Sequence, residues 1–181
     1  VWVKDEAGNV SAGKTVTTTK YTVTYYIDTS STQTQQFVPG QSVISGLNFT
    51  PSKSGYTFVG WREDKTASSS VLSSKTMGNS GITLYAVFRQ NVTVTKYNGS
   101  ASATTESKYK YYNNGNVANP SFTLSQSALS GWTAAGWTTS ASATGSTAVN
   151  NGGSVTLSGN ATYYGKYTQT ITLSYSGNGA T

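Results

Sequence analysis

The chain has 181 residues, of which 35% are hydrophobic and only 10% are charged. Its length suits one or two small domains, because domains commonly contain roughly 100–150 residues. Cysteine and histidine are both absent, which excludes disulfides, thiolate nucleophiles, imidazole bases and the usual zinc clusters.

The formal net charge of +6, from twelve basic and six acidic residues, raises nucleic acid as a possible partner. A nucleic-acid surface favours a clustered basic stripe that is rich in arginine. The lysines here are scattered, and the only arginines are Arg62 and Arg89. The densest cluster, KYKYY at 108–112, is interpreted as a half-buried strand whose lysines face solvent. We therefore expect no nucleic-acid partner.

No run of about 18 apolar residues occurs, so we expect no membrane insertion. The N-terminal string VWVKDEAGNVS alternates hydrophobic residues at Val1 and Val3 and continues into an acidic turn. It resembles the closing strand of bacterial immunoglobulin-like or fibronectin-like modules. We interpret residues 1–13 as the tail strand of a preceding immunoglobulin-like domain. Residues 14–20 are then a linker or a lead-in strand.

From residue 21 onward the chain repeats itself at a spacing of more than seventy residues. Three motifs return in the same order: YTVTYY (21–26) as VTVTKY (92–97), SGYTFVGW (54–61) as SGWTAAGW (130–137), and GITLYAVF (81–88) as NATYYGKY (160–167). The first motif appears once more as TITLSY at 170–175. This order predicts three parts: repeat unit 1 at 21–89, repeat unit 2 at 90–167, and the first strand of a further unit at 168–181.

The recurring motifs alternate apolar and polar residues with a period of two, which predicts β-strands. In the first motif, for example, Val23 and Tyr25 point to one face, while Thr24 and Tyr26 point to the other. No long stretch has helical spacing. We therefore predict a mainly β fold, with a β-rich α+β fold as the alternative.

The SGYTFVGW strip places Phe58 and Trp61 on opposite faces of a strand, if side chains alternate strictly. A unit of this size buries little core, so a few large aromatic side chains must supply much of it. Trp61 and Trp137 hold the same position in the two units. We interpret them as core residues, with a sugar-stacking platform as the alternative.

Together these motifs resemble the Listeria–Bacteroides repeat, or internalin B-type repeat, of bacterial surface proteins. GYTFVGW and ITLYAVF carry the resemblance in unit 1, and GWTAAGW and ATYYGKY carry it in unit 2. The resemblance implies small β-grasp-like, ubiquitin-like domains in tandem, which we expect as an elongated pair. It also implies a location on the bacterial surface or cell wall, with attachment through segments outside this stretch.

The acidic residues offer no catalytic pair. Glycoside hydrolysis needs two carboxyl groups that face one another across a bond. Glu63 and Asp64 are neighbours in sequence, so a strand would point them to opposite faces, and Glu106 is the only acid of unit 2. We expect no enzyme activity, no catalytic residue, no cofactor and no metal site.

Two functions fit these observations. The first is a non-catalytic surface-protein fragment whose repeats act as a spacer and as an interaction or adhesion unit. The alternative is a module that binds carbohydrate or a host protein through exposed tyrosine and tryptophan. The contact candidates are four tyrosines, Tyr109, Tyr111, Tyr163 and Tyr164, of which strand alternation should turn some toward the core. The expected partner is a host or neighbouring-cell surface protein or a glycan, and the chain is expected to be a monomer.

Overall fold

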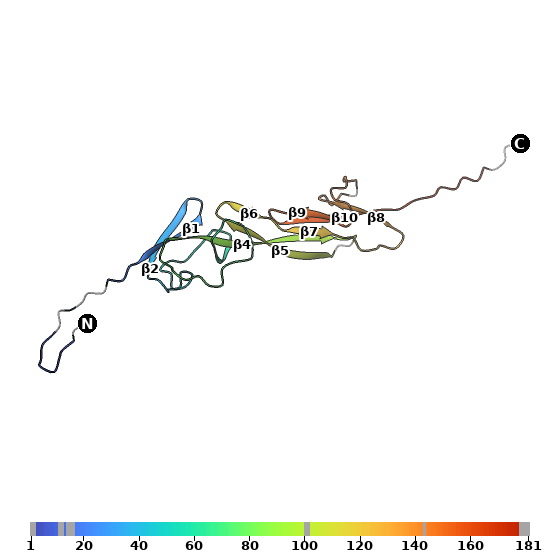
Figure 1. Ribbon diagram of the computed structural model, residues 1–181. Helices are drawn as coiled ribbons and strands as arrows, with labels where there is room; N and C mark the ends of the chain where they lie inside the picture. Colours follow the sequence, from blue (N-terminus) through green and yellow to red (C-terminus); the bar gives the residue numbers. More distant parts are fainter. Residues whose placement is uncertain (1–2, 11–12, 14–16, 100–101, 143, 178–181) are drawn as a thin grey trace. The chain divides into compact units, whose positions relative to one another are not determined.

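A computed structural model describes residues 3–10, 13, 17–99, 102–142 and 144–177 of the chain. These residues form strands, turns and loops and no helix (Figure 1). The prediction of a mainly β fold is therefore confirmed, while the finer β-grasp-like arrangement stays a prediction. The chain divides into two compact units, which are Val1–Phe88 with Asn113–Asn116, and Arg89–Tyr112 with Val117–Thr181.

Unit 1 is built on four strands: β1 (Tyr21–Asp28), β2 (Ser31–Phe37), β3 (Thr57–Arg62) and the first part of β4 (Ile82–Tyr97). Strand β1 pairs antiparallel with β2 and parallel with β4, and β3 also pairs with β4. The predicted alternation of β1 is confirmed, because Val23, Tyr25 and Ile27 are buried. Threonine lies on the opposite face, so this strand buries one face only.

Aromatic rings fill the core of unit 1. Trp61 is 2% exposed and packs against the rings of Tyr25 and Phe58, at centroid distances of 4.9 and 5.3 Å. The contact with Phe58 corrects the expectation that these two side chains lie on opposite faces. Strict alternation fails in β3, which brings residues three positions apart against the same core.

Six further strands follow in the chain: β5 (Ala103–Asn113), β6 (Asn116–Ala118), β7 (Ser121–Leu124), β8 (Thr133–Thr138), β9 (Gly153–Thr156) and β10 (Ala161–Thr168). In unit 2, β10 pairs parallel with the second part of β4 and antiparallel with β8. Strands β7 and β9 form a separate antiparallel pair. The core of the unit is a cluster of six buried side chains, Val92, Val94, Phe122, Leu124, Trp137 and Tyr163.

The sequence repeat is also a repeat of strand pairing. In unit 1, Tyr26 is the pairing partner of Tyr85, and their rings stack with centroids 5.2 Å apart. In unit 2, Tyr97 is the pairing partner of Tyr164, and their rings stack at 5.1 Å. The first and the closing motif of each unit therefore meet as parallel strands in the same register.

The terminal segments form no named strand in their described residues, and their assignment to a neighbouring immunoglobulin-like domain, a linker and a further repeat unit stays a prediction. Of residues 1–13, the described part 3–10 forms an isolated turn, in which Asn9 donates its backbone N–H to the Asp5 carboxylate at 2.8 Å. The described part of 14–20, residues 17–20, forms no strand. Residues 169–177 form no strand either, and their apolar side chains are almost fully exposed: Ile171 at 86%, Leu173 at 91% and Tyr175 at 92%.

Candidate functional site

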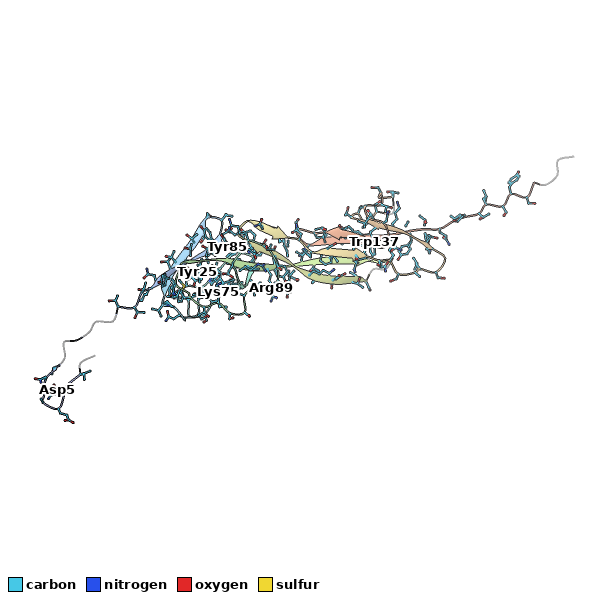
Figure 2. The ribbon with its side chains drawn as sticks, viewed as in Figure 1. Asp5, Tyr25, Lys75, Tyr85, Arg89 and Trp137 are labelled. Atoms are coloured by element: carbon cyan, nitrogen blue, oxygen red, sulfur yellow. The ribbon has the colours of Figure 1, made fainter. Side chains whose placement is uncertain are left out.

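The two repeated tryptophans lie in the cores. Trp137 is completely buried, and its indole N–H donates to the carbonyl of Leu124 at 2.8 Å (Figure 2). Trp61 is 2% exposed. Their interpretation as core residues is confirmed, and a sugar-stacking platform made of this pair is excluded.

Two of the four candidate tyrosines share one accessible face of β5. Tyr109 is 44% exposed and Tyr111 is half-buried, with ring centroids 6.4 Å apart. The guanidinium of Arg89 lies 4.2 Å from the centre of the Tyr109 ring, within the range of a cation–π interaction. These residues form a small aromatic and cationic surface.

The other two candidates belong to β10 and have different environments. Tyr163 is 7% exposed and is part of the unit 2 core, so it cannot contact a ligand and is withdrawn as a candidate. Tyr164 is half-buried against Tyr97 and also lines a surface groove. Alternation along the strand explains the difference, because neighbouring residues point to opposite faces.

We expected the lysines of β5 to face solvent, but both of them form hydrogen bonds within the protein. Lys108 donates to the carbonyl of Ser121 at 2.6 Å, and its ammonium lies 5.0 Å from the centre of the Phe122 ring. Lys110 donates to the carbonyl of Ser158 at 2.7 Å. Both ammonium groups therefore hydrogen-bond to main-chain carbonyls in β7 or just after β9.

Four acidic side chains, Asp28, Glu63, Asp64 and Glu106, form ion pairs with neighbouring cations. Asp64 forms an ion pair with Arg62 at 2.8 Å, and hydrogen bonds from that guanidinium hold the pKa of Asp64 well below its usual range. Glu63 pairs with Lys75, and Glu106 lies 3.2 Å from Lys96. Within the described ranges, no three acidic side chains gather as a metal site would require. The same part of the chain contains no helix with the length and apolar character for crossing a membrane.

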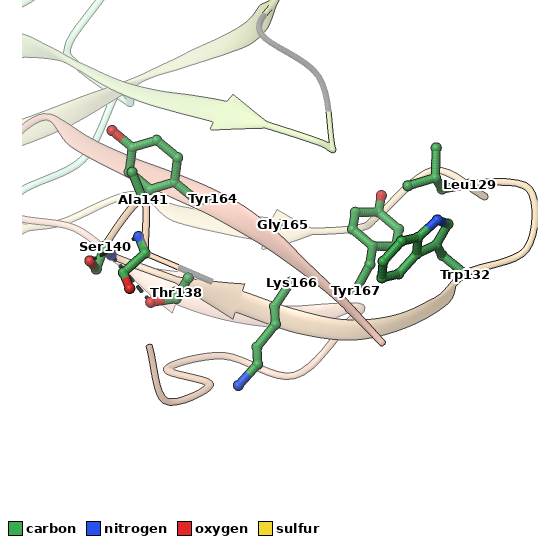
Figure 3. Close-up of a pocket in the computed structure, with 10 residues that line it drawn as sticks. Leu129, Trp132, Thr138, Ser140, Ala141, Tyr164, Gly165, Lys166 and Tyr167 are labelled. Atoms are coloured by element: carbon green, nitrogen blue, oxygen red, sulfur yellow. Dashed lines mark hydrogen bonds between the residues drawn. The ribbon is translucent and has the colours of Figure 1, made fainter. Parts of the chain in front are cut away.

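A groove with a volume of about 270 Å³ opens on the surface of unit 2 (Figure 3). Its lining comes from β8, β10 and the loops that flank β8: Leu129, Trp132, Thr138, Ser140, Ala141, Ser142, Tyr164, Gly165, Lys166 and Tyr167. Leu129, Trp132 and Tyr167 gather at one end. Thr138, Ser140 and Tyr164 lie toward the other end, so the groove has an aromatic end and a hydroxyl-bearing end.

A tight turn holds Trp132 at the groove. The backbone N–H of Trp132 donates to the carbonyl of Leu129 at 3.0 Å, and Gly131 takes a positive φ of 76° within this turn. Glycine suits that conformation because it has no Cβ. Trp132 is 47% exposed. Sequence comparison aligned it with Tyr56 of unit 1 but could not show that its ring reaches solvent.

Tyr167 forms the other half of the aromatic end. Its hydroxyl lies within hydrogen-bonding reach of the Asn98 side-chain oxygen and of the Ser127 carbonyl, which is 2.8 Å away. Partial burial raises the pKa of Tyr167 above its ordinary value. The ring is therefore fixed and uncharged at neutral pH. It stands beside the exposed indole as a preformed surface.

The remaining polar groups of the groove include a single ionised side chain, that of Lys166. Thr138 accepts a hydrogen bond from the backbone N–H of Ser140 at 3.2 Å. The ammonium of Lys166 donates to the carbonyl of Gly145 at 2.8 Å, and its side chain extends away from Trp132 and Tyr167 (Figure 3). The groove therefore offers aromatic faces and hydroxyl groups but no carboxylate and no unengaged ammonium.

These features define the class of protein: an all-β repeat protein with small cores that contain large aromatic side chains. Residues 21–87 match the model of the Listeria-Bacteroides repeat domain, the family that the motifs of this part of the chain resemble. Such repeats occur in bacterial surface proteins. No curated protein and no solved structure matches the chain significantly.

Proposed function

We propose that this chain is a non-catalytic part of a bacterial surface protein, in which the repeats separate neighbouring domains and also serve as interaction or adhesion units. The observation that carries the proposal is the match of residues 21–87 to a repeat domain of bacterial surface proteins. The proposal places the chain outside the cell, attached through other segments of its parent protein.

The packing of each unit supports this role. Trp61 in unit 1 and Trp137 in unit 2 each organise a separate aromatic core. The sequence has no cysteine, so neither core depends on a disulfide. A spacer needs units that stay folded without a cofactor. Burial of large aromatic side chains supplies much of the stability of a small domain.

Surface exposure can be tested on intact cells of the bacterium that encodes the chain. Antibodies raised against the purified chain should label these cells without permeabilisation. Labelling that appears only after the envelope is opened would contradict the proposal. Antibody against a cytoplasmic protein serves as the control for envelope integrity.

The spacer role needs a different experiment. The gene segment for residues 21–167 is replaced by an unrelated folded spacer of similar length, and display of the neighbouring domains is measured by antibody binding. Retained display supports a spacing role for the repeats. If the replacement retains display but abolishes adhesion of the cells, the interaction role is supported as well. If the cells retain both display and adhesion after the replacement, the interaction role is contradicted.

The alternative function, a module that binds carbohydrate or a host protein, has one specific feature in its favour on β5. Tyr109 and Tyr111 offer accessible rings beside the Arg89 guanidinium. Tyrosine and arginine are enriched at the energetic centres of protein interfaces. A Tyr109→Ala variant that no longer binds host-cell surfaces, while it remains folded, would support this alternative.

A further inference from the structure

The two repeats differ where unit 2 has its groove. The closing strand of unit 1 places Ala86, Val87 and Phe88 in the core, all at 0% exposure. The aligned residues of unit 2 are Gly165, Lys166 and Tyr167, which are only partly buried and which line the groove. An interior stretch of one repeat has therefore become a surface stretch of the other.

The neighbouring strand shows a matching loss of volume. In unit 1 the ring of Phe58 packs against Phe88, with centroids 5.6 Å apart. The corresponding pair in unit 2 is Ala134 and Tyr167, which are direct pairing partners across β8 and β10. Alanine in place of phenylalanine removes the ring that covers this position. Tyr167 is left partly exposed, and Trp132 stands beside the opening.

From this we propose that the groove of unit 2 binds a neutral saccharide. Trp132 and Tyr167 would stack on the face of a sugar ring, and the hydroxyl-bearing end would hydrogen-bond to sugar hydroxyls. This inference rests on the interaction role proposed above and names its ligand class. The spacing role does not depend on it.

Charge and chemistry favour a sugar over other ligands. The C–H face of a pyranose ring is apolar and packs on aromatic rings, while its edge carries hydroxyls that need partners. The groove pairs these two properties along its length, with Trp132 at one end and Ser140 at the other. The ammonium of Lys166 is engaged by a carbonyl. The lining holds no carboxylate, and its one ammonium already donates to a main-chain carbonyl, so recognition in the groove rests mainly on the aromatic faces and the hydroxyl groups.

The groove is preformed. The turn from Leu129 to Trp132 is closed by a main-chain hydrogen bond, and the Tyr167 hydroxyl is anchored at its tip. Little ordering of side chains would accompany binding, which favours affinity for a small ligand. The volume of about 270 Å³ lies just below the roughly 300–1,000 Å³ of typical small-molecule sites, so it suits one or two sugar rings.

A site for so few atoms should bind weakly, with a dissociation constant on the order of millimolar. The test is therefore an NMR titration of the complete, isotope-labelled chain, following the indole N–H signal of Trp132. The probes are the neutral hexasaccharides of cellulose, starch, laminarin, mannan and chitin. A hyaluronan hexasaccharide is the charged comparison.

We expect at least one neutral hexasaccharide to shift the Trp132 signal saturably, while the buried Trp61 and Trp137 signals stay unchanged. Trp132→Ala should weaken that binding at least ~10-fold, as removal of a central aromatic contact generally does. Tyr167→Phe keeps the ring but loses the hydroxyl anchor, so it should weaken binding less. Val117→Ala removes an exposed apolar side chain of the same unit outside the groove and should leave affinity unchanged.

The proposal is overturned if none of the five neutral probes shifts the Trp132 signal. It is equally overturned if Val117→Ala weakens binding as much as Trp132→Ala, or if hyaluronan binds as tightly as the neutral probes. These outcomes leave the proposed function open to its own tests, because antibody labelling of intact cells measures surface exposure and replacement of residues 21–167 measures the spacer role.

The exposed segment with Ile171 and Leu173 is a competing occupant, because it follows β10 directly. A double variant, Ile171→Ser with Leu173→Ser, distinguishes the two. If the terminal segment does not occupy the groove, this variant has the same Trp132 signal and the same affinity for the saccharide as the unaltered chain. A shifted Trp132 signal without any added saccharide would mean that the segment fills the groove, which would overturn the proposal.

Discussion

Trp137 donates its indole N–H to the main-chain carbonyl of Leu124 at 2.8 Å, and both residues are completely buried. The bond joins β8 to the end of β7 through the middle of the unit 2 core. It also satisfies the one polar atom of the indole, which would otherwise be buried without a partner. A single side chain thus contributes apolar volume and fixes its own orientation.

Replacement of this tryptophan should strongly destabilise unit 2. Trp137→Ala leaves a large cavity and removes one of the two hydrogen bonds to the Leu124 carbonyl, so the free energy of unfolding should fall by about 3–5 kcal/mol. Denaturant titration followed by circular dichroism measures the change. Trp132→Ala is the matched control, because its ring is 47% exposed, and it should change stability by less than about 1 kcal/mol. Equal losses in both variants would contradict the core assignment.

The Asn113 side chain should matter for the stability of unit 1. It is completely buried and donates to the carbonyls of Asp64 and Thr66, at 2.9 and 3.1 Å. Asn113→Ala leaves both carbonyls without this donor, so unfolding should become easier by about 1–3 kcal/mol. Asn116→Ala removes one exposed bond to the Lys65 carbonyl and should have a smaller effect. Thermal unfolding of the two variants measures the two losses of stability. A larger loss for Asn116→Ala than for Asn113→Ala would contradict this reasoning.

Two glycines provide a test of backbone geometry in unit 2. Gly136 has a φ of 100°, and a Cβ built there would lie 2.5 Å from the Val149 carbonyl oxygen. Gly152 has a φ of 77°, and a Cβ would meet nothing within 4 Å. Gly152→Ala should show only the conformational penalty of about 1–2 kcal/mol for a side chain at positive φ. Gly136→Ala should show this penalty and, in addition, the cost of a steric clash. Chemical denaturation should show a clearly larger loss in the free energy of unfolding for Gly136→Ala than for Gly152→Ala. Similar losses would argue against the close approach of Gly136 to the Val149 carbonyl.

Tyr25 should make unit 1 sensitive to alkali. Burial raises the pKa of its phenol to about 12, from an ordinary value of 10.0, and the hydroxyl donates to the Val43 carbonyl at 2.7 Å. The folded protein therefore keeps a proton that the unfolded chain releases. The stabilisation is fully present below pH 10 and is lost as the pH rises toward 12.

The matched variant for this effect is Tyr25→Phe, which retains the buried ring but has no ionisable group. Its free energy of unfolding should fall less than that of the unaltered protein between pH 10 and 12. The two curves are measured by denaturant titration at each pH. Parallel declines would show that the other tyrosines, and not this phenol, govern alkaline unfolding.

Strand type, repeat order and the buried tryptophans could be predicted because each has a local or repeated signature. Period-two alternation separates the two faces of β1, and Trp61 and Trp137 recur at one position of the repeat. Strict alternation was nevertheless wrong at Phe58, whose ring meets Trp61. Irregular pairing in a short strand depends on the strands beside it, and no residue pattern within the strand records that.

The sequence by itself determined that this chain is a β-rich repeat with aromatic cores, because alternation and duplication are properties of residue order. Only the tertiary structure decided that Tyr163 is buried while Trp132 and Tyr109 are exposed. It also decided that Tyr167 lines a groove where unit 1 has the buried Phe88. The reason is physical: alternation shows that two faces differ, but which face is covered depends on the volume of side chains that distant strands bring to it.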